Sequence, residues 1–121
     1  MEEETKFHKI VRIGQGHGLV IPTKWMEEHE LQSGDPLKIT FNGVLKVTPV
    51  KIEVHISQTQ IVFIKDSASL KITKEIVVRA LNKYGIEQTV GRLCLRVANY
   101  FDCPINAKRV MACIEKFLLI R

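Results

Sequence analysis

The sequence predicts an α+β fold in which short strands come first and helices follow. Residues 11–50 contain four short apolar runs separated by turn signals, and residues 51–65 alternate as a further hairpin. Residues 73–121 then change to helical periodicity. The chain has 121 residues, enough for one domain or two very small ones. We therefore expect an N-terminal domain over residues 1–50 and a C-terminal domain over residues 51–121.

The first elements are a strand, a glycine-rich loop and a second apolar run. The strand is predicted over residues 9–13, and the loop reads Gly14-Gln15-Gly16-His17-Gly18. The apolar run over residues 19–21 reads as a strand that stops at Pro22, which lacks an N–H group. These runs are too short to bury themselves within one chain, so we expect a second copy of the chain to complete the unit.

A short helix and a hairpin follow. Thr23 is the predicted N-cap of a helix over residues 24–29. Residues 37–41 alternate with period two, and residues 44–48 form the predicted return strand. The connecting Asn42-Gly43 predicts a type I′ turn, in which both central residues have positive φ.

The order and spacing of these motifs resemble the swapped-hairpin DNA-binding domain of the SpoVT/AbrB/MazE family. The resemblance covers residues 6–50 and is carried by Val11-Arg12-x-Gly14, Gly18-x-x-Ile21-Pro22, Leu31-x-x-Gly34-Asp35 and Asn42-Gly43. It implies that two chains intertwine their hairpins into one barrel-like dimer. It also implies that basic residues near the first loop bind DNA.

The resemblance implies two sets of site residues. The DNA-facing residues are polar side chains around the first loop: Lys6, Lys9, Arg12, Gln15, His17 and Lys24. The dimer interface consists of larger apolar side chains: Val11, Ile13, Leu19, Ile21, Trp25, Leu37, Ile39 and Val47. The chain departs from the family at Leu19 and Val20, where many members carry arginine or another polar group. This departure favours a chiefly dimer-forming role for the N-terminal domain.

The C-terminal domain is predicted to begin with a hairpin over residues 51–65 and a loop over residues 66–69. Three helices follow, over residues 73–84, over residues 89–100 and from Asn106 onward. Gly85 stands where a glycine commonly ends a helix, and Asn106 is a favourable N-cap. The predicted architecture is thus a hairpin followed by three helices.

The break over residues 101–105 between the last two helices is compatible with a helix-turn-helix. Lys108 and Arg109 would then lie at the N-terminal end of the third helix, where recognition helices meet base edges. Arg92 and Arg96 of the second helix would contact phosphates. A helical bundle for dimerisation or for binding a protein partner is the alternative.

The distribution of charge is more informative than the net charge of +5. Residues 1–50 hold six basic and seven acidic side chains, whereas residues 51–121 hold twelve basic and six acidic ones. The basic half is therefore not the half that resembles a DNA-binding family. A basic balance suits nucleic acid, whose phosphates attract lysine and arginine at long range.

The sequence contains no pattern typical of an enzyme. The glycine-rich loop is not GxGxxG and no helix follows it, so a phosphate cradle is not expected. The four histidines are isolated in the sequence. Cys94, Cys103 and Cys113 contain no CxxC motif and are expected to be reduced and mostly buried. We expect neither catalysis nor a metal nor a cofactor.

The leading hypothesis is a homodimeric, sequence-specific DNA-binding transcriptional regulator whose partners are double-stranded DNA and itself. The acidic start and the absence of a long apolar run predict a cytoplasmic protein without a membrane span. A MazE-like antitoxin is one alternative, although such antitoxins usually end in an acidic tail and this C-terminal half is basic. A dimerisation adaptor that binds no DNA is the other.

Overall fold

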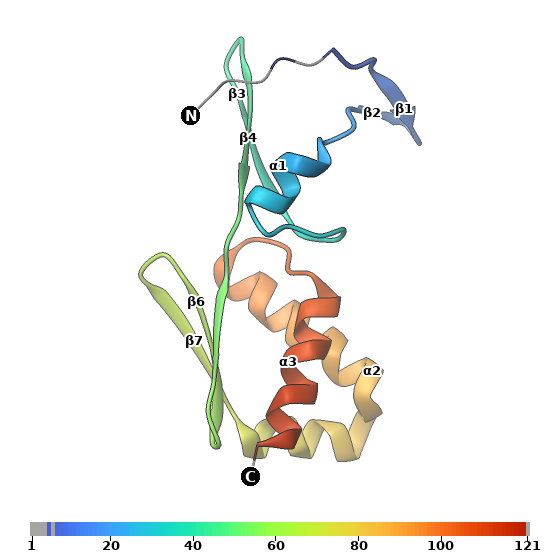
Figure 1. Cartoon of the computed structure of the whole chain (residues 1–121). Coiled ribbons are helices and arrows are strands. Elements are labelled where there is room, and N and C mark those ends of the chain that lie inside the picture. The colour runs from blue at the N-terminus through green and yellow to red at the C-terminus, as the bar shows by residue number, and fades with distance from the viewer. Residues whose placement is uncertain (1–4, 6, 121) are drawn as a thin grey trace. The chain divides into compact units, whose positions relative to one another are not determined.

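The computed structural model describes residue 5 and residues 7–120, and its elements are shown in chain order in Figure 1. The fold is α+β, with small antiparallel hairpins first and two helices last. The chain separates into two compact units between Gln32 and Ser33. The predicted boundary at residue 50 lies within the second unit.

The first unit contains a very short hairpin and one short helix. Strand β1 (Val11–Ile13) pairs antiparallel with β2 (Gly16–Gly18), and helix α1 spans Thr23–Glu28. Residues 16–18, which were predicted to belong to the loop over residues 14–18, are therefore a strand. The strand predicted over residues 19–21 is absent, because nothing in the described part of the chain pairs with it. The N-cap prediction was also wrong, since Pro22 holds that position without a side-chain hydrogen bond.

The second unit begins with the predicted hairpin of β3 (Leu37–Phe41) and β4 (Leu45–Pro49). Phe41 faces Leu45 across the two strands, so the loop has three residues instead of the predicted two. Gly43 has a φ of +76°, but Asn42 is not among the described residues with positive φ, which contradicts a type I′ turn. The described strands of the N-terminal half form two separate two-stranded sheets and no closed barrel.

A three-stranded antiparallel sheet follows, in the order β5 (Glu53–Ile56), β6 (Gln60–Lys65) and β7 (Ala68–Thr73). The first two strands confirm the predicted hairpin. The third strand was missed, because residues 66–69 were interpreted as a loop. Asp66 adopts a φ of +55° in a tight turn from Lys65 to Ala68, which returns the chain directly into β7.

The unit is completed by helix α2 (Lys74–Phe101) and helix α3 (Ala107–Leu119). Within α2, Gly85 has a φ of +81° and a ψ of 174°, which are not helical, so two helical segments meet there as the sequence predicted. The second segment begins directly after Gly85 and not at residue 89. Helix α3 begins as predicted, with the Asn106 side chain accepting a hydrogen bond from the Lys108 N–H at 3.0 Å.

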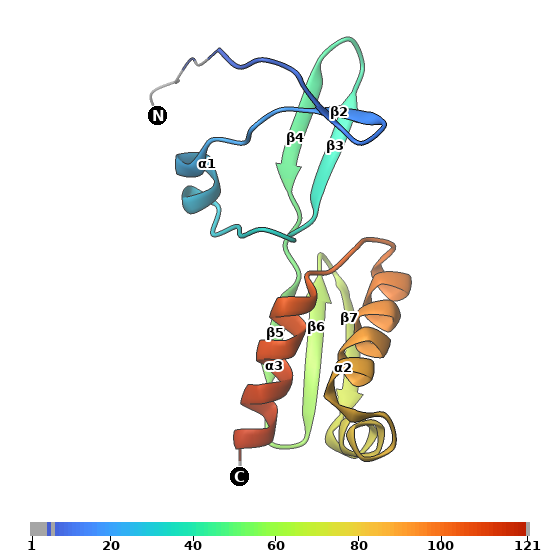
Figure 2. The ribbon, with the colours of Figure 1, turned by 90° about the vertical axis from the view of Figure 1, so that its right-hand side faces the viewer.

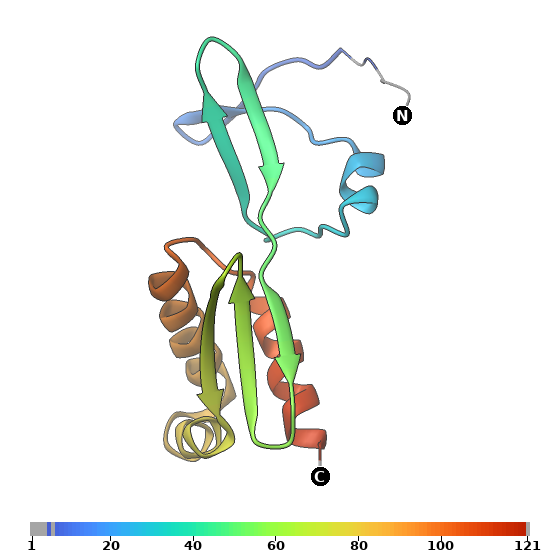
Figure 3. The same ribbon diagram turned by 90° about the vertical axis from the view of Figure 1, so that its left-hand side faces the viewer.

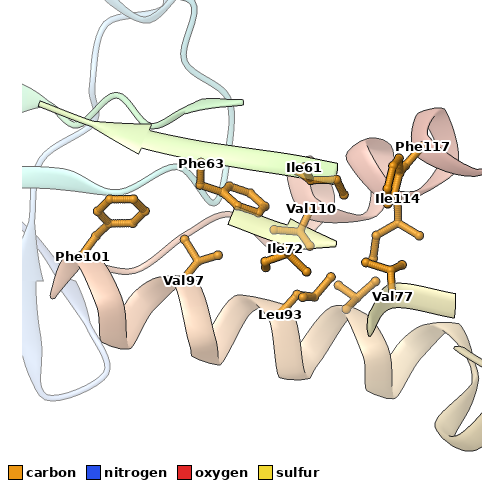
Figure 4. Packing of buried hydrophobic residues seen from close by; sticks show 11 residues of the cluster. Ile61, Phe63, Ile72, Val77, Leu93, Val97, Phe101, Val110, Ile114 and Phe117 are labelled. Atoms are coloured by element: carbon orange, nitrogen blue, oxygen red, sulfur yellow. The ribbon is translucent and has the colours of Figure 1, made fainter. Parts of the chain in front are cut away.

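Both helices cover the same face of the three-stranded sheet, as the opposite views of Figures 2 and 3 show. Figure 4 shows the core between these two layers. It consists of Ile61 and Phe63 from β6, Ile72 from β7, Val77, Val90, Leu93, Val97 and Phe101 from α2, and Val110, Ile114 and Phe117 from α3. The hydrophobic core of the second unit is thus a single layer between sheet and helices.

Candidate nucleic-acid interface

The polar residues around the first loop are presented by the β1–β2 hairpin. The pairing of the two strands places Arg12 opposite His17, and both are exposed. Side chains opposite each other in an antiparallel pair lie on the same face. Gln15 follows in the turn, and the Arg12 Nε donates a hydrogen bond to the Gly14 carbonyl at 3.2 Å. The hairpin therefore gathers three polar side chains that suit phosphate or base contacts.

Three further residues were predicted to face DNA. Lys9 precedes β1 and Lys24 lies in the first turn of α1, and both are exposed. Lys6 lies outside the described residues. Every predicted DNA-facing residue of this half that the structure describes is accessible to a ligand.

The predicted dimer residues fall into an exposed set and a half-buried set. Val11, Ile13, Leu19 and Ile39 are exposed, whereas Ile21, Trp25, Leu37 and Val47 are half-buried. None of the eight is fully buried within the single chain.

The β3–β4 hairpin has one continuous apolar face. Leu37, Ile39 and Phe41 alternate along β3, and their cross-strand partners are Pro49, Val47 and Leu45. Phe41 is 80% exposed. The sequence prediction omitted Phe41 and Leu45, although the period-two alternation that identified Ile39 places Phe41 on the same face. Exposed apolar surfaces of this kind typically mark an interface.

The C-terminal arginines have different surroundings. Arg92 and Arg96 lie on the exposed side of α2, and the Arg92 guanidinium is 3.7 Å from the centre of the Tyr84 ring. Arg109 instead forms two hydrogen bonds of 2.7 Å to the Asp35 carboxylate, from its Nε and from one terminal nitrogen. Lys108 is exposed. Arg109 is therefore engaged within the protein, which weakens its role in base recognition.

Asp35 belongs to a polar cluster at the start of α3. Its side chain is only 5% exposed and also accepts a hydrogen bond from the Asn106 Nδ2 at 3.0 Å. The same Nδ2 donates to the Ser33 carbonyl at 3.1 Å. Gly34 has a φ of +95°, and a Cβ there would lie 3.0 Å from the Asn106 Oδ1. The segment before β3 thus covers the end of α3 that a recognition helix would present to DNA.

The three cysteines are free and half-buried. Burial raises the pKa of the Cys94 thiol and of the Cys113 thiol, and at Cys113 the neighbouring Lys116 and Arg109 offset part of the effect. In the part of the chain that the structure describes, no group of three or more histidine, cysteine or acidic residues is arranged to hold a metal ion. None of the described helices is long and apolar enough to cross a membrane.

Comparison with family models, with curated proteins and with solved structures found no match to the chain. The resemblance to the SpoVT/AbrB/MazE family consequently depends on the four motifs in the sequence.

Proposed function

We propose that the protein is a homodimeric DNA-binding transcriptional regulator that resembles the SpoVT/AbrB class. The observation that carries the proposal is the lack of a core in its N-terminal strands. Among the described residues, none before Ile61 is buried, although residues 37–49 have the apolar and polar faces of a half-buried sheet. A folded protein needs a partner surface for such strands, and a second copy of the chain supplies one by exchanging hairpins.

Exposed apolar side chains of the N-terminal half supply surface that a dimer would bury. Full burial of one valine, leucine, isoleucine or phenylalanine side chain contributes about 1.5–3 kcal/mol. In a two-fold dimer the same interface residue is buried in both chains, so its contribution counts twice. Val11, Ile13 and Leu19 of the first unit and Ile39 of the second are all exposed in the single chain, so each can contribute.

The same dimer would carry two copies of the β1–β2 hairpin. On each copy Arg12 lies opposite His17 and Gln15 follows in the turn, and these exposed side chains offer donors for phosphates and base edges. Two-fold symmetry of the protein predicts a palindromic or repeated DNA site. The regulatory role follows from the family resemblance, in which such dimers act at specific sites.

The test is a titration of a labelled DNA duplex with the full chain over a range of salt concentrations. We expect the logarithm of the binding constant to fall linearly with the logarithm of the salt concentration, by about 0.9 for each phosphate bound. Arg12→Ala should weaken binding and make this slope shallower. Arg79→Ala is the matched control, because Arg79 is an exposed arginine already paired with Glu75 at 2.7 Å.

Two results would overturn the proposal in different ways. A dimer that binds no duplex even at low salt would indicate an adaptor without a nucleic-acid role. Copurification of a small protein partner that the chain neutralises would indicate an antitoxin.

A further inference from the structure

A shallow groove of about 630 Å³ lies between strand β7 and helix α2 of the second unit. It is lined by Leu70 of β7 and by Arg92, Leu95, Arg96, Asn99 and Tyr100 of α2. Figure 2 shows that the orange part of α2, after Gly85, runs along the β7 side of the sheet, whereas α3 runs along the β5 side. All six residues belong to one compact unit, so the groove is a feature of that unit alone.

The polar residues of the groove follow one stripe of α2. Arg92 and Arg96 are four residues apart and Asn99 follows three residues later, which places them on the same helix face. Four residues correspond to a rise of about 6 Å along the helix axis. The stripe therefore presents two guanidinium groups and an amide in line.

Both arginines lack a carboxylate partner in the described part of the chain. Arg92 stacks on the Tyr84 ring, a contact that orients the guanidinium plane without using its N–H donors. Two other arginines of the second unit are neutralised instead, Arg79 by Glu75 and Arg109 by Asp35. The groove thus holds cationic side chains that the fold has left available for an anion.

Tyr100 fixes the wall of the groove and limits what can bind there. Its hydroxyl donates a hydrogen bond to the Ser69 carbonyl at 2.8 Å, and Ser69 lies on β7, an edge strand of the sheet. A peptide that added to β7 as a further strand would have to compete with this bond. The geometry therefore favours a ligand recognised by side chains over one recognised by strand pairing.

We propose that this groove binds the sugar–phosphate backbone of double-stranded DNA. Arg92 and Arg96 contact neighbouring phosphates, Asn99 donates to an adjacent phosphate or sugar oxygen, and the Leu95 side chain and the Tyr100 ring contact the deoxyribose. The excess of basic residues in the chain's second half attracts the same polyanion at long range. The inference rests on the proposed function, because it adds a contact without sequence preference to a DNA-binding protein.

The test compares the salt dependence of duplex binding between variants of the full chain. Arg92→Ala combined with Arg96→Ala should weaken binding to every duplex sequence alike. It should also make the salt slope shallower by about 0.9 for each phosphate that the variant no longer binds. Arg92→Lys combined with Arg96→Lys keeps the charges and should retain most of the slope. Arg79→Ala, on the same helix but paired with Glu75, should leave it unchanged. Far-ultraviolet circular dichroism checks that each variant is folded.

The results separate this inference from the proposed function. If the wild-type chain binds duplex but the double alanine variant keeps its full salt slope, the groove does not bind DNA and the proposed function stands. If that variant loses affinity for polyglutamate while its duplex binding is unchanged, the groove takes an acidic peptide and the inference is wrong. If the wild-type chain binds no duplex, both proposals fail.

Discussion

The N-terminal strands and the C-terminal sheet use the same alternation of apolar and polar residues with opposite results. In β6, Ile61 and Phe63 are completely buried because α2 and α3 cover that face of the sheet. In β3, Ile39 and Phe41 alternate in the same way, yet both are exposed. The difference teaches that alternation specifies a face to be buried but does not specify what covers it. For β6 the cover is in the chain, and for β3 we propose a second chain.

The largest expected effect comes from a substitution in the β3–β4 hairpin that should dissociate the proposed dimer. Ile39→Asp places a carboxylate on the apolar face of the hairpin in both chains of the proposed dimer. Each Ile39 side chain is 56% exposed in the single chain, so loss of the burial of two isoleucines alone removes about 2–3 kcal/mol of dimer stability, to which the desolvation of two carboxylates is added. Gel filtration should show the variant eluting as a monomer. Lys38→Ala, a change at the neighbouring residue on the polar face, should leave a dimer. Equal elution of both variants would contradict the proposed interface.

The next effect addresses the C-terminal core. Phe63→Ala should lower the free energy of unfolding by about 3–5 kcal/mol, because it opens a cavity between the sheet and both helices. Urea unfolding followed by circular dichroism measures this loss. Phe63→Leu should cost clearly less if the alanine variant does not fold. Leu119→Ala, at a side chain 80% exposed on α3, should change stability by no more than about 0.5 kcal/mol.

A smaller effect is expected from the polar cluster at the start of α3. Asp35→Asn removes the charge that Arg109 contacts and should cost about 1–3 kcal/mol, since the Asp35 side chain is almost fully buried. A double-mutant cycle with Arg109→Ala should give a coupling energy between the two residues that accounts for most of this loss. Glu75→Gln, in the exposed pair with Arg79, should cost no more than about 1 kcal/mol. Additive losses at Asp35 and Arg109 would show that the two do not interact in solution.

The smallest effect is a pH dependence from Cys94 and Cys113. Burial raises the pKa of both thiols above the ordinary value of 9.0, so the unfolded thiol ionises first as the pH rises. The stability that they contribute is therefore full below pH 9.0 and is lost as the pH rises through the pKa values of the folded protein. Urea unfolding across this range should show a shallower decline for Cys113→Ala than for the wild-type chain. Identical declines would mean that Cys113 does not contribute.

The fold was predictable where the signal lies in adjacent residues. Asn106 was identified as an N-cap because its side chain satisfies a nearby N–H, and the 3.6-residue periodicity identified the buried face of α2. Strand β7 was missed even though Leu70 and Ile72 alternate with polar residues, because the turn at Asp66 has no glycine. Gly85 was correctly interpreted as a helix end, because its φ and ψ are not helical and two helical segments of α2 meet there.

The candidate sites were less predictable, because they depend on contacts between distant residues. Nothing near Arg109 in the sequence indicates that Asp35, far earlier in the chain, binds it. Helical spacing predicted Arg92 and Arg96 as phosphate contacts. It did not predict the Tyr84 ring on which Arg92 stacks, or Tyr100, which lines the groove of both arginines. The N-terminal residues Arg12 and His17 were placed by the family resemblance, and their pairing across β1 and β2 required the structure.

The central claim is that the N-terminal strands obtain their core from a second chain. Nuclear magnetic resonance on a sample refolded from equal amounts of isotope-labelled and unlabelled protein tests it most directly, with isotope-filtered spectra that detect only contacts between chains. We predict intermolecular nuclear Overhauser effects among the methyl groups of Ile13, Leu19 and Ile39. A sample in which these methyl groups show no contact with the other chain would contradict the account.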